Sequence, residues 1–124
     1  GDSLFLMFDR LETALDLARA LRDETADVDW THYQLPADLS YRIALDAGPC
    51  FSYQDPITTQ QDYCGHYVVR AARLEPVTPP GHVFASETFV ALARMKGIPA
   101  AVFHYAGQIA LPKEYGFVQA FHVE

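Results

Sequence analysis

The chain is short of features that would tie it to a membrane, to nucleic acid or to a disulfide scaffold. None of its apolar runs approaches the ~20 residues that a membrane-spanning helix needs. Nine basic residues stand against sixteen acidic ones, for a net charge of −7, whereas nucleic-acid surfaces normally carry a basic patch. Two cysteines in 124 residues favour reduced core thiols over a disulfide framework. We therefore expect a cytoplasmic protein with no membrane span and no nucleic-acid partner.

The composition is that of a folded protein. Hydrophobic residues make up 50% and charged residues 20% of the chain, which predicts a packed core rather than disorder. A length of 124 residues is enough for one domain and one core, so residues 1–124 are assigned to a single domain. The first residue is Gly1 and not Met, and strand character begins almost at once. We therefore expect further chain upstream.

The N-terminal part predicts a strand, then a helix, then a loop. Residues 4–8 form a continuous apolar run of strand length, with a helix as the competing interpretation. Asp9 follows as a predicted helix N-cap, and Glu12 would complete a capping box. Apolar residues at three- and four-residue steps predict a helix over residues 10–22. The stretch of residues 23–38 is rich in acidic side chains, shows no sustained hydrophobic period, and predicts a surface loop.

The middle of the chain predicts a strand, a hairpin and a second helix. Apolar and polar residues alternate over residues 41–46, which predicts a strand. Residues 53–61 are polar and contain the turn signal Asp55-Pro56, so we expect a hairpin loop or flap there. Helical apolar spacing returns over residues 65–75, and Pro76 ends it because proline cannot continue a helix.

The last third predicts a short strand, a third helix and two closing strands. Residues 82–85 form the short strand, and Ser86 is an N-cap for a helix over residues 87–96 that ends at Gly97. Strands are expected over residues 101–111 and 117–123. Aromatic residues in these strands are most simply core: Phe103, Tyr105, Phe117 and Phe121. The mixture of elements indicates an α+β or α/β domain with helices packed on a sheet.

Several short segments, in a fixed order along the chain, carry recognisable motifs. They are Gly1-Asp2 (a "GD" turn), residues 42–49 (RIALDAGP, like "RIGIHTGP"), Asp62-Tyr63-Cys64-Gly65 with residues 68–75 (like "D-x-x-G…VNxAARLE"), residues 80–87 (PGHVFASE, like "PGQILVSE") and the closing Gly107…Leu111-Pro112-Lys113…Gly116. In this order they resemble the motifs of class III nucleotidyl cyclases, the adenylate and guanylate cyclase family. The resemblance covers almost the whole chain and implies a ferredoxin-like α+β fold with a mostly antiparallel sheet. The family's first strands and helices would lie upstream, leaving the C-terminal two thirds of its domain here.

The resemblance implies a set of site residues. Asp2 would be one of two metal-binding aspartates for Mg²⁺ or Mn²⁺, Asp62 would accept a hydrogen bond from the purine, and Lys113 would reach the triphosphate. Arg73 would stabilise the transition state as ribose 3′-hydroxyl attacks the α-phosphate and pyrophosphate leaves. Three of the four have a purely structural alternative: a turn aspartate for Asp2, a helix N-terminal carboxylate for Asp62, and for Arg73 an ion pair with a nearby acid, for example Asp62 or Glu75.

One position departs from the pattern in a way that bears on activity. The family has an asparagine four residues before the arginine, on the same helix face, and here that residue is Val69. Valine can neither donate nor accept a hydrogen bond, and losing one such oriented group commonly costs roughly 10²–10³ in rate. The sequence therefore favours a catalytically impaired, nucleotide-sensing or dimerisation module of a signalling protein. An active cyclase with its site at a homodimer interface is the alternative.

Overall fold

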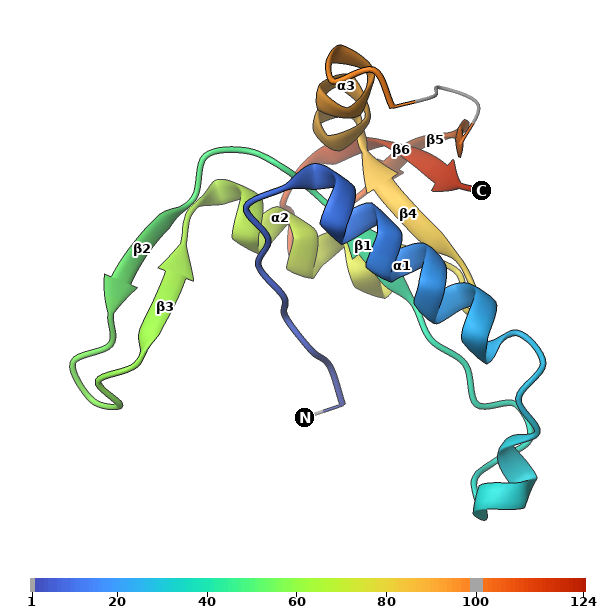
Figure 1. Ribbon diagram of the computed structural model, residues 1–124. Helices are drawn as coiled ribbons and strands as arrows, with labels where there is room; N and C mark the ends of the chain where they lie inside the picture. The colour runs from blue at the N-terminus through green and yellow to red at the C-terminus, as the bar shows by residue number, and fades with distance from the viewer. Residues whose placement is uncertain (1, 99–101) are drawn as a thin grey trace.

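A four-stranded mixed sheet forms the centre of the computed structural model, which describes residues 2–98 and 102–124. The strand order is β1-β4-β6-β5. β1 pairs with β4 in parallel, and β6 pairs antiparallel with both β4 and β5. The α+β fold with a mostly antiparallel sheet is confirmed (Figure 1). The strands are β1 (Ile43–Leu45), β4 (Val83–Ser86), β5 (Phe103–Ala110) and β6 (Phe117–Val123).

Helices cover both faces of the sheet, because alternate residues of its strands are apolar on opposite sides. Helices α1 (Leu11–Thr25) and α3 (Glu87–Met95) bury one face, with Leu15 and Phe89 packed against Val83. Helix α2 (His66–Leu74) and the 3₁₀ turn η2 (Glu75–Val77) lie on the other face. There Leu74, which is 1% exposed, packs against the strand residues Phe84, Val118 and Ala120 and against Leu111, which directly follows β5.

A two-stranded hairpin stands apart from the central sheet (Figure 1). It consists of β2 (Phe51–Gln54) and β3 (Gln61–Cys64), with Phe51 opposite Cys64. The Asp55 carboxylate accepts the Ile57 amide at 2.7 Å and so closes the turn at its tip. The predicted hairpin at residues 53–61 is confirmed, and it feeds directly into α2.

The third helix shows how local sequence sets its ends. The Ser86 hydroxyl accepts the Phe89 amide at 3.2 Å, as an N-cap does. At the other end Gly97 has φ = +80°, the left-handed conformation that commonly ends a helix. The predicted helix over residues 87–96 is therefore confirmed together with both of its signals.

The predicted strand at residues 4–8 is wrong. Those residues have no regular structure, and Leu4 is 89% exposed. A strand needs a partner for its backbone hydrogen bonds, and among the described residues nothing pairs with this segment. The expected cap at Asp9 is also wrong, since α1 begins after Arg10 with no side-chain cap bond. Gly1 lies outside the described residues.

Other differences lie at the surface. The predicted loop at residues 23–38 contains the end of α1 and a 3₁₀ turn, η1 (Trp30–Tyr33), capped by Asp29. Both cysteines are free as expected, but neither is in the core, since Cys50 is half-buried and Cys64 exposed. Tyr105 is 62% and Phe117 67% exposed, so only part of the aromatic set is core. The first residue of the predicted strand 101–111 lies outside the described residues. No helix in the described part of the chain is both long and apolar enough to span a bilayer.

Candidate functional site

The candidate site is built around α2, which the sequence places immediately after the hairpin. Gly65 makes the junction with φ = +134°, a backbone conformation that favours glycine. Apolar residues at helical spacing then turn one side of α2 towards the sheet, where Leu74 is buried. The helix passes into the 3₁₀ turn at Glu75-Pro76. The predicted helix over residues 65–75 is thus confirmed.

Arg73 lies in the last turn of α2. Its Nε is buried and has no hydrogen-bond partner among the described residues. The two carboxylates that could have neutralised it are engaged elsewhere, because Glu75 lies 3.0 Å from the Arg42 guanidinium and Asp62 bonds within the hairpin. The expected alternative, an ion pair of Arg73 with one of these acids, is therefore wrong. A buried donor left without an acceptor costs about 1–3 kcal/mol, so this guanidinium is suited to an anionic ligand.

Asp62 lies on β3, on the exposed surface of the hairpin. Its carboxylate accepts the Tyr53 hydroxyl at 3.2 Å and the Tyr63 amide at 2.8 Å. The hydrogen bond and the negative charge of Asp62 raise the pKa of Tyr53, so this phenol remains a donor. The bonds that Asp62 makes are those of a carboxylate within the hairpin rather than of a cap on the first turn of α2. Its solvent-facing position leaves it accessible to a ligand.

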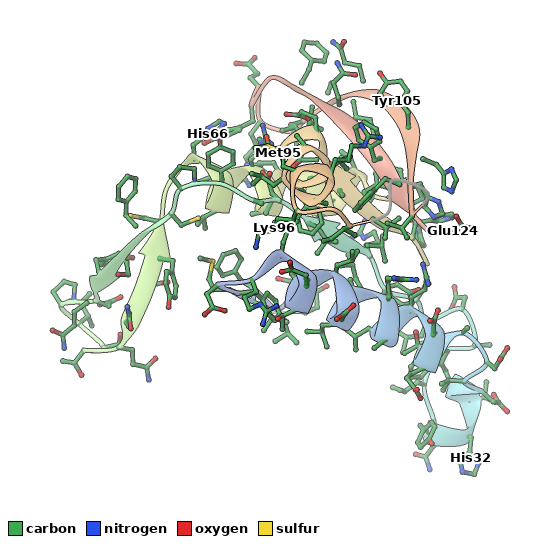
Figure 2. All side chains as sticks on the ribbon, turned by 45° about the horizontal axis from the view of Figure 1, so that its top comes forward. His32, His66, Met95, Lys96, Tyr105 and Glu124 are labelled. Atoms are coloured by element: carbon green, nitrogen blue, oxygen red, sulfur yellow. The ribbon has the colours of Figure 1, made fainter. Side chains whose placement is uncertain are left out.

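Lys113 lies in the turn between β5 and β6, and the turn contacts the N-terminal end of α2. Both Lys113 (φ = +58°) and Glu114 (φ = +56°) adopt the left-handed conformation, which is uncommon for residues other than glycine. Tyr115 stacks on His66, with ring centroids 5.8 Å apart and planes inclined by 17°. Figure 2 shows His66 where the hairpin meets α2. The stack brings the lysine-bearing turn against the helix that carries Arg73.

Asp2 is exposed and lies in the irregular N-terminal segment. No hydrogen bond or ion pair of the described residues joins any two of Asp2, Asp62, Arg73 and Lys113. In the same part of the chain no three His, Cys, Asp or Glu side chains are grouped to hold a metal ion. Asp2 alone does not make up the donor set that Mg²⁺ takes from proteins. Its metal-binding role stays a prediction.

The best-ordered polar cluster beside Arg73 was missed at the level of sequence. Arg70 of α2 contacts the Asp46 carboxylate through two nitrogens, Nε–Oδ2 at 2.7 Å and Nη2–Oδ1 at 2.9 Å. The Asp46 side chain is 1% exposed. A signal was present, because Asp46 stands where the resembled "RIGIHTGP" motif has histidine and Arg70 occupies the variable position of "VNxAARLE". The one departure, Asp46, is thus paired with the residue at the variable position, Arg70.

Comparison with known proteins places the fold. No protein-family model and no curated protein matches the chain. Among solved structures, the adenylyl cyclase CyaB from P. aeruginosa matches with a TM-score of 0.72 at 20% identity, over 92% of this chain. The guanylate cyclase domain of RhGC from Catenaria anguillulae, in complex with GTP, matches with a TM-score of 0.61 at 17% identity, over 96% of this chain. The chain has the class III nucleotidyl cyclase fold.

An adenylate cyclase structure from Trypanosoma brucei, described as monomeric, matches with a TM-score of 0.56 at 19% identity over 90% of this chain. This chain spans 60%, 62% and 52% of the three matched chains, in the order given. The resemblance read from the sequence motifs is therefore confirmed at the level of fold.

Proposed function

We propose that this chain is a cyclase-fold signalling module that binds a nucleoside triphosphate and has lost most or all of its turnover. The observation that carries the proposal is Arg73, whose buried Nε lacks an acceptor in the described protein. A triphosphate oxygen would supply that acceptor, and bonds between a guanidinium and an anionic oxygen are roughly twice as strong as neutral ones.

Lys113 and Asp62 would complete the binding mode from either side of α2. The Lys113 turn is tied to the N-terminal end of α2 by the Tyr115–His66 stack. Its ammonium is a compact cation suited to phosphate. Asp62 is an exposed acceptor on the hairpin, of the kind that can take a hydrogen bond from the amino group of a purine.

The impairment follows from Val69. It lies one turn before Arg73, at i−4, so both side chains point to the same face of α2. An apolar side chain there cannot orient the ribose or share the charge that develops at the phosphate. Val69 therefore leaves the nucleotide without one polar contact, a loss that weighs most on the transition state, and Arg73 remains as the anchor for binding.

The test is calorimetry with ATP and GTP, each with Mg²⁺ and with Mn²⁺, joined to an assay for cyclic product. We expect binding that falls at least about tenfold in Arg73→Ala, the loss of one charge-assisted contact, and also falls in Lys113→Ala. Arg19→Ala is the matched control, because Arg19 is an arginine of α1 on the opposite side of the sheet. It should bind as the unmodified protein does.

Two outcomes would overturn the proposal in different directions. If neither nucleotide binds under any condition, the chain is an interaction domain without nucleotide chemistry. If cyclic product forms and Asp2→Ala abolishes it, the chain is an active cyclase in spite of Val69. Binding that is lost in Asp62→Ala, without turnover, would support a sensor of purine nucleotides.

A further inference from the structure

We propose that Arg70 is the positioning residue of the Arg73 site: its buried pair with Asp46 fixes α2 on the sheet and so holds the Arg73 guanidinium where a phosphate would meet it. The inference rests on the proposed nucleotide binding at Arg73. It concerns two residues to which the resembled motifs assign no role: Asp46, which stands in place of a histidine, and Arg70, which stands at a variable position.

Arg70 makes hydrogen bonds to three residues outside its own helix, one directly after β1 and two in α3. Its Nε and Nη2 donate to Asp46, which directly follows β1. Nη1 donates to Glu87 Oε1 at 2.9 Å, and Nη2 also donates to Thr88 Oγ1 at 2.8 Å, both in the first turn of α3. The Arg70 side chain is 12% exposed. A planar guanidinium with this many directed bonds can adopt few orientations. These bonds therefore restrict both the position of α2 and its rotation about its own axis.

The partners of Arg70 are themselves fixed. The Ser86 hydroxyl donates to Asp46 Oδ1 at 2.5 Å, and the Gln119 amide of β6 donates to Glu87 Oε2 at 2.9 Å. The cluster thus joins α2, α3, β6 and the residue that follows β1 through directed hydrogen bonds. Bonds to Asp46 and Glu87 also raise the pKa of Arg70, and its charge is constant over the whole working range of pH.

Tyr67 adds a steric stop on the same side of α2. Its ring lies against Gly48 so closely that a Cβ on that glycine would overlap it. The Arg70 guanidinium carbon is 5.2 Å from the centre of the same ring, within the range of a cation–π contact. The loop from β1 to the hairpin and the start of α2 are therefore packed as one unit.

The link to Arg73 is short and rigid. Arg73 follows Arg70 by three residues, so the two side chains lie on neighbouring positions of one helix face about 4.5 Å apart along the axis. Glu75 cannot orient Arg73, since it pairs with Arg42, and Val69 offers no polar contact. Arg70 is the nearest directed anchor on α2, and a change in its geometry is passed to Arg73 through the helix.

The experiment is a double-mutant cycle read by nucleotide affinity, with amide hydrogen exchange of α2 as a second readout. Arg70→Lys keeps the charge but loses the two-nitrogen contact with Asp46. We expect it to lower ATP affinity about tenfold in the unmodified protein and less than about twofold in the Arg73→Ala background, because coupled sites are not additive. Amides at residues 71–74 should exchange faster in Arg70→Lys.

Two further variants keep the test decisive. Glu87→Gln keeps the side-chain shape but removes the charge and one of the two acceptor oxygens that bond Arg70 and the Gln119 backbone amide. It should show the same pattern more weakly if Arg70→Lys does not fold. Arg42→Lys is the matched control, since it alters an arginine ion pair with Glu75, just after the C-terminal end of α2, that is far more exposed than the Arg70–Asp46 pair. It should leave both affinity and exchange unchanged.

The outcomes separate this inference from the proposed function. Arg70→Lys could lower ATP affinity equally in the unmodified protein and in Arg73→Ala, or it could leave both amide exchange and ATP binding unchanged. Either result overturns the role of Arg70 and leaves the proposed nucleotide binding intact. Absence of nucleotide binding in the unmodified protein, with faster exchange in Arg70→Lys, overturns the proposed function and supports the anchoring of α2.

Discussion

Val69 is the residue that we expect to impair turnover while nucleotide binding at Arg73 is kept. It lies on the Arg73 face of α2, where the resembled motif has asparagine. We expect Val69→Asn to raise nucleotide affinity several-fold, since a hydrogen bond to a charged partner contributes about 1.5–3 kcal/mol before its ordering cost. Val69→Ala is the control, because it opens space without adding a polar group. Equal affinity in Val69→Asn and Val69→Ala would show that residue 69 does not face the nucleotide.

His122 predicts a pH dependence of stability. Burial, and then the nearby cationic groups His82, His104 and Arg22, lower the pKa of His122, with Glu124 opposing them. The unfolded chain therefore binds a proton on His122 at a higher pH than the folded chain does. Protonation favours unfolding, so stability present above the ordinary histidine pKa near 6.5 is lost as the pH falls below it.

The measurement is the melting temperature between pH 7.5 and pH 5. We expect it to fall with pH, and to fall less in His122→Gln, which cannot titrate. His32→Gln is the control, since His32 is exposed on η1 and should leave the slope unchanged. Identical slopes in the parent protein and His122→Gln would refute the assignment.

Among the elements, the β5–β6 turn stores strain beside the candidate site. Lys113 and Glu114 have the successive positive φ angles that type I′ hairpin turns require and that Asn-Gly adopts at little cost. Replacing Glu114 by glycine should stabilise the fold by a few tenths to about 1 kcal/mol, the relief of left-handed strain less the added freedom of the unfolded chain. Chemical denaturation would measure this, with Gly116→Ala as the opposite case, destabilising because Gly116 has φ = +88°.

The close contact of Tyr67 with Gly48 allows a test of how tightly the start of α2 packs against the loop that follows β1. Gly48 has no positive φ, so alanine is tolerated by its backbone and opposed only by the Tyr67 ring. We expect Gly48→Ala to cost about 1–3 kcal/mol of stability, as overpacking does. Tyr67→Leu should make the same substitution nearly neutral. Additive costs in the double variant would mean that the ring is not the obstacle.

A feature of the fold was predictable when the residues that determine it lie close together in the sequence. Helix α3 was predictable because Ser86, the apolar period and Gly97 lie within one short segment. The hairpin was predictable from the turn signal Asp55-Pro56 within a short polar stretch. Residues 4–8 were not, because a strand depends on a partner that periodicity does not reveal. Arg73 could be located on its helix, but its unpaired Nε and the Asp46–Arg70 pair depend on residues far apart in sequence meeting at one point.

At the scale of the whole molecule, the distribution of apolar surface predicts self-association. Leu4 is 89%, Phe5 50% and Leu6 52% exposed, in a segment whose backbone pairs with no other part of the described chain. β1 forms an edge of the central sheet and is only three residues long. An unpaired apolar segment of strand-like sequence and an open sheet edge invite pairing between copies of the chain. We therefore expect a homodimer in solution.

The dimer prediction can be tested by solution scattering and light scattering over a range of concentrations. Leu4→Lys/Leu6→Lys should shift the chain to monomer, since charge on a would-be pairing strand opposes edge-to-edge association. Ile57→Lys is the matched control, because Ile57 is also 89% exposed but lies at the tip of the hairpin. If Ile57→Lys dissociates the dimer and the Leu4/Leu6 variant does not, the hairpin is the contact. A compact monomer of the parent chain at every concentration would contradict self-association altogether. In that case a triphosphate bound at Arg73 would have to be held by the groups of one chain.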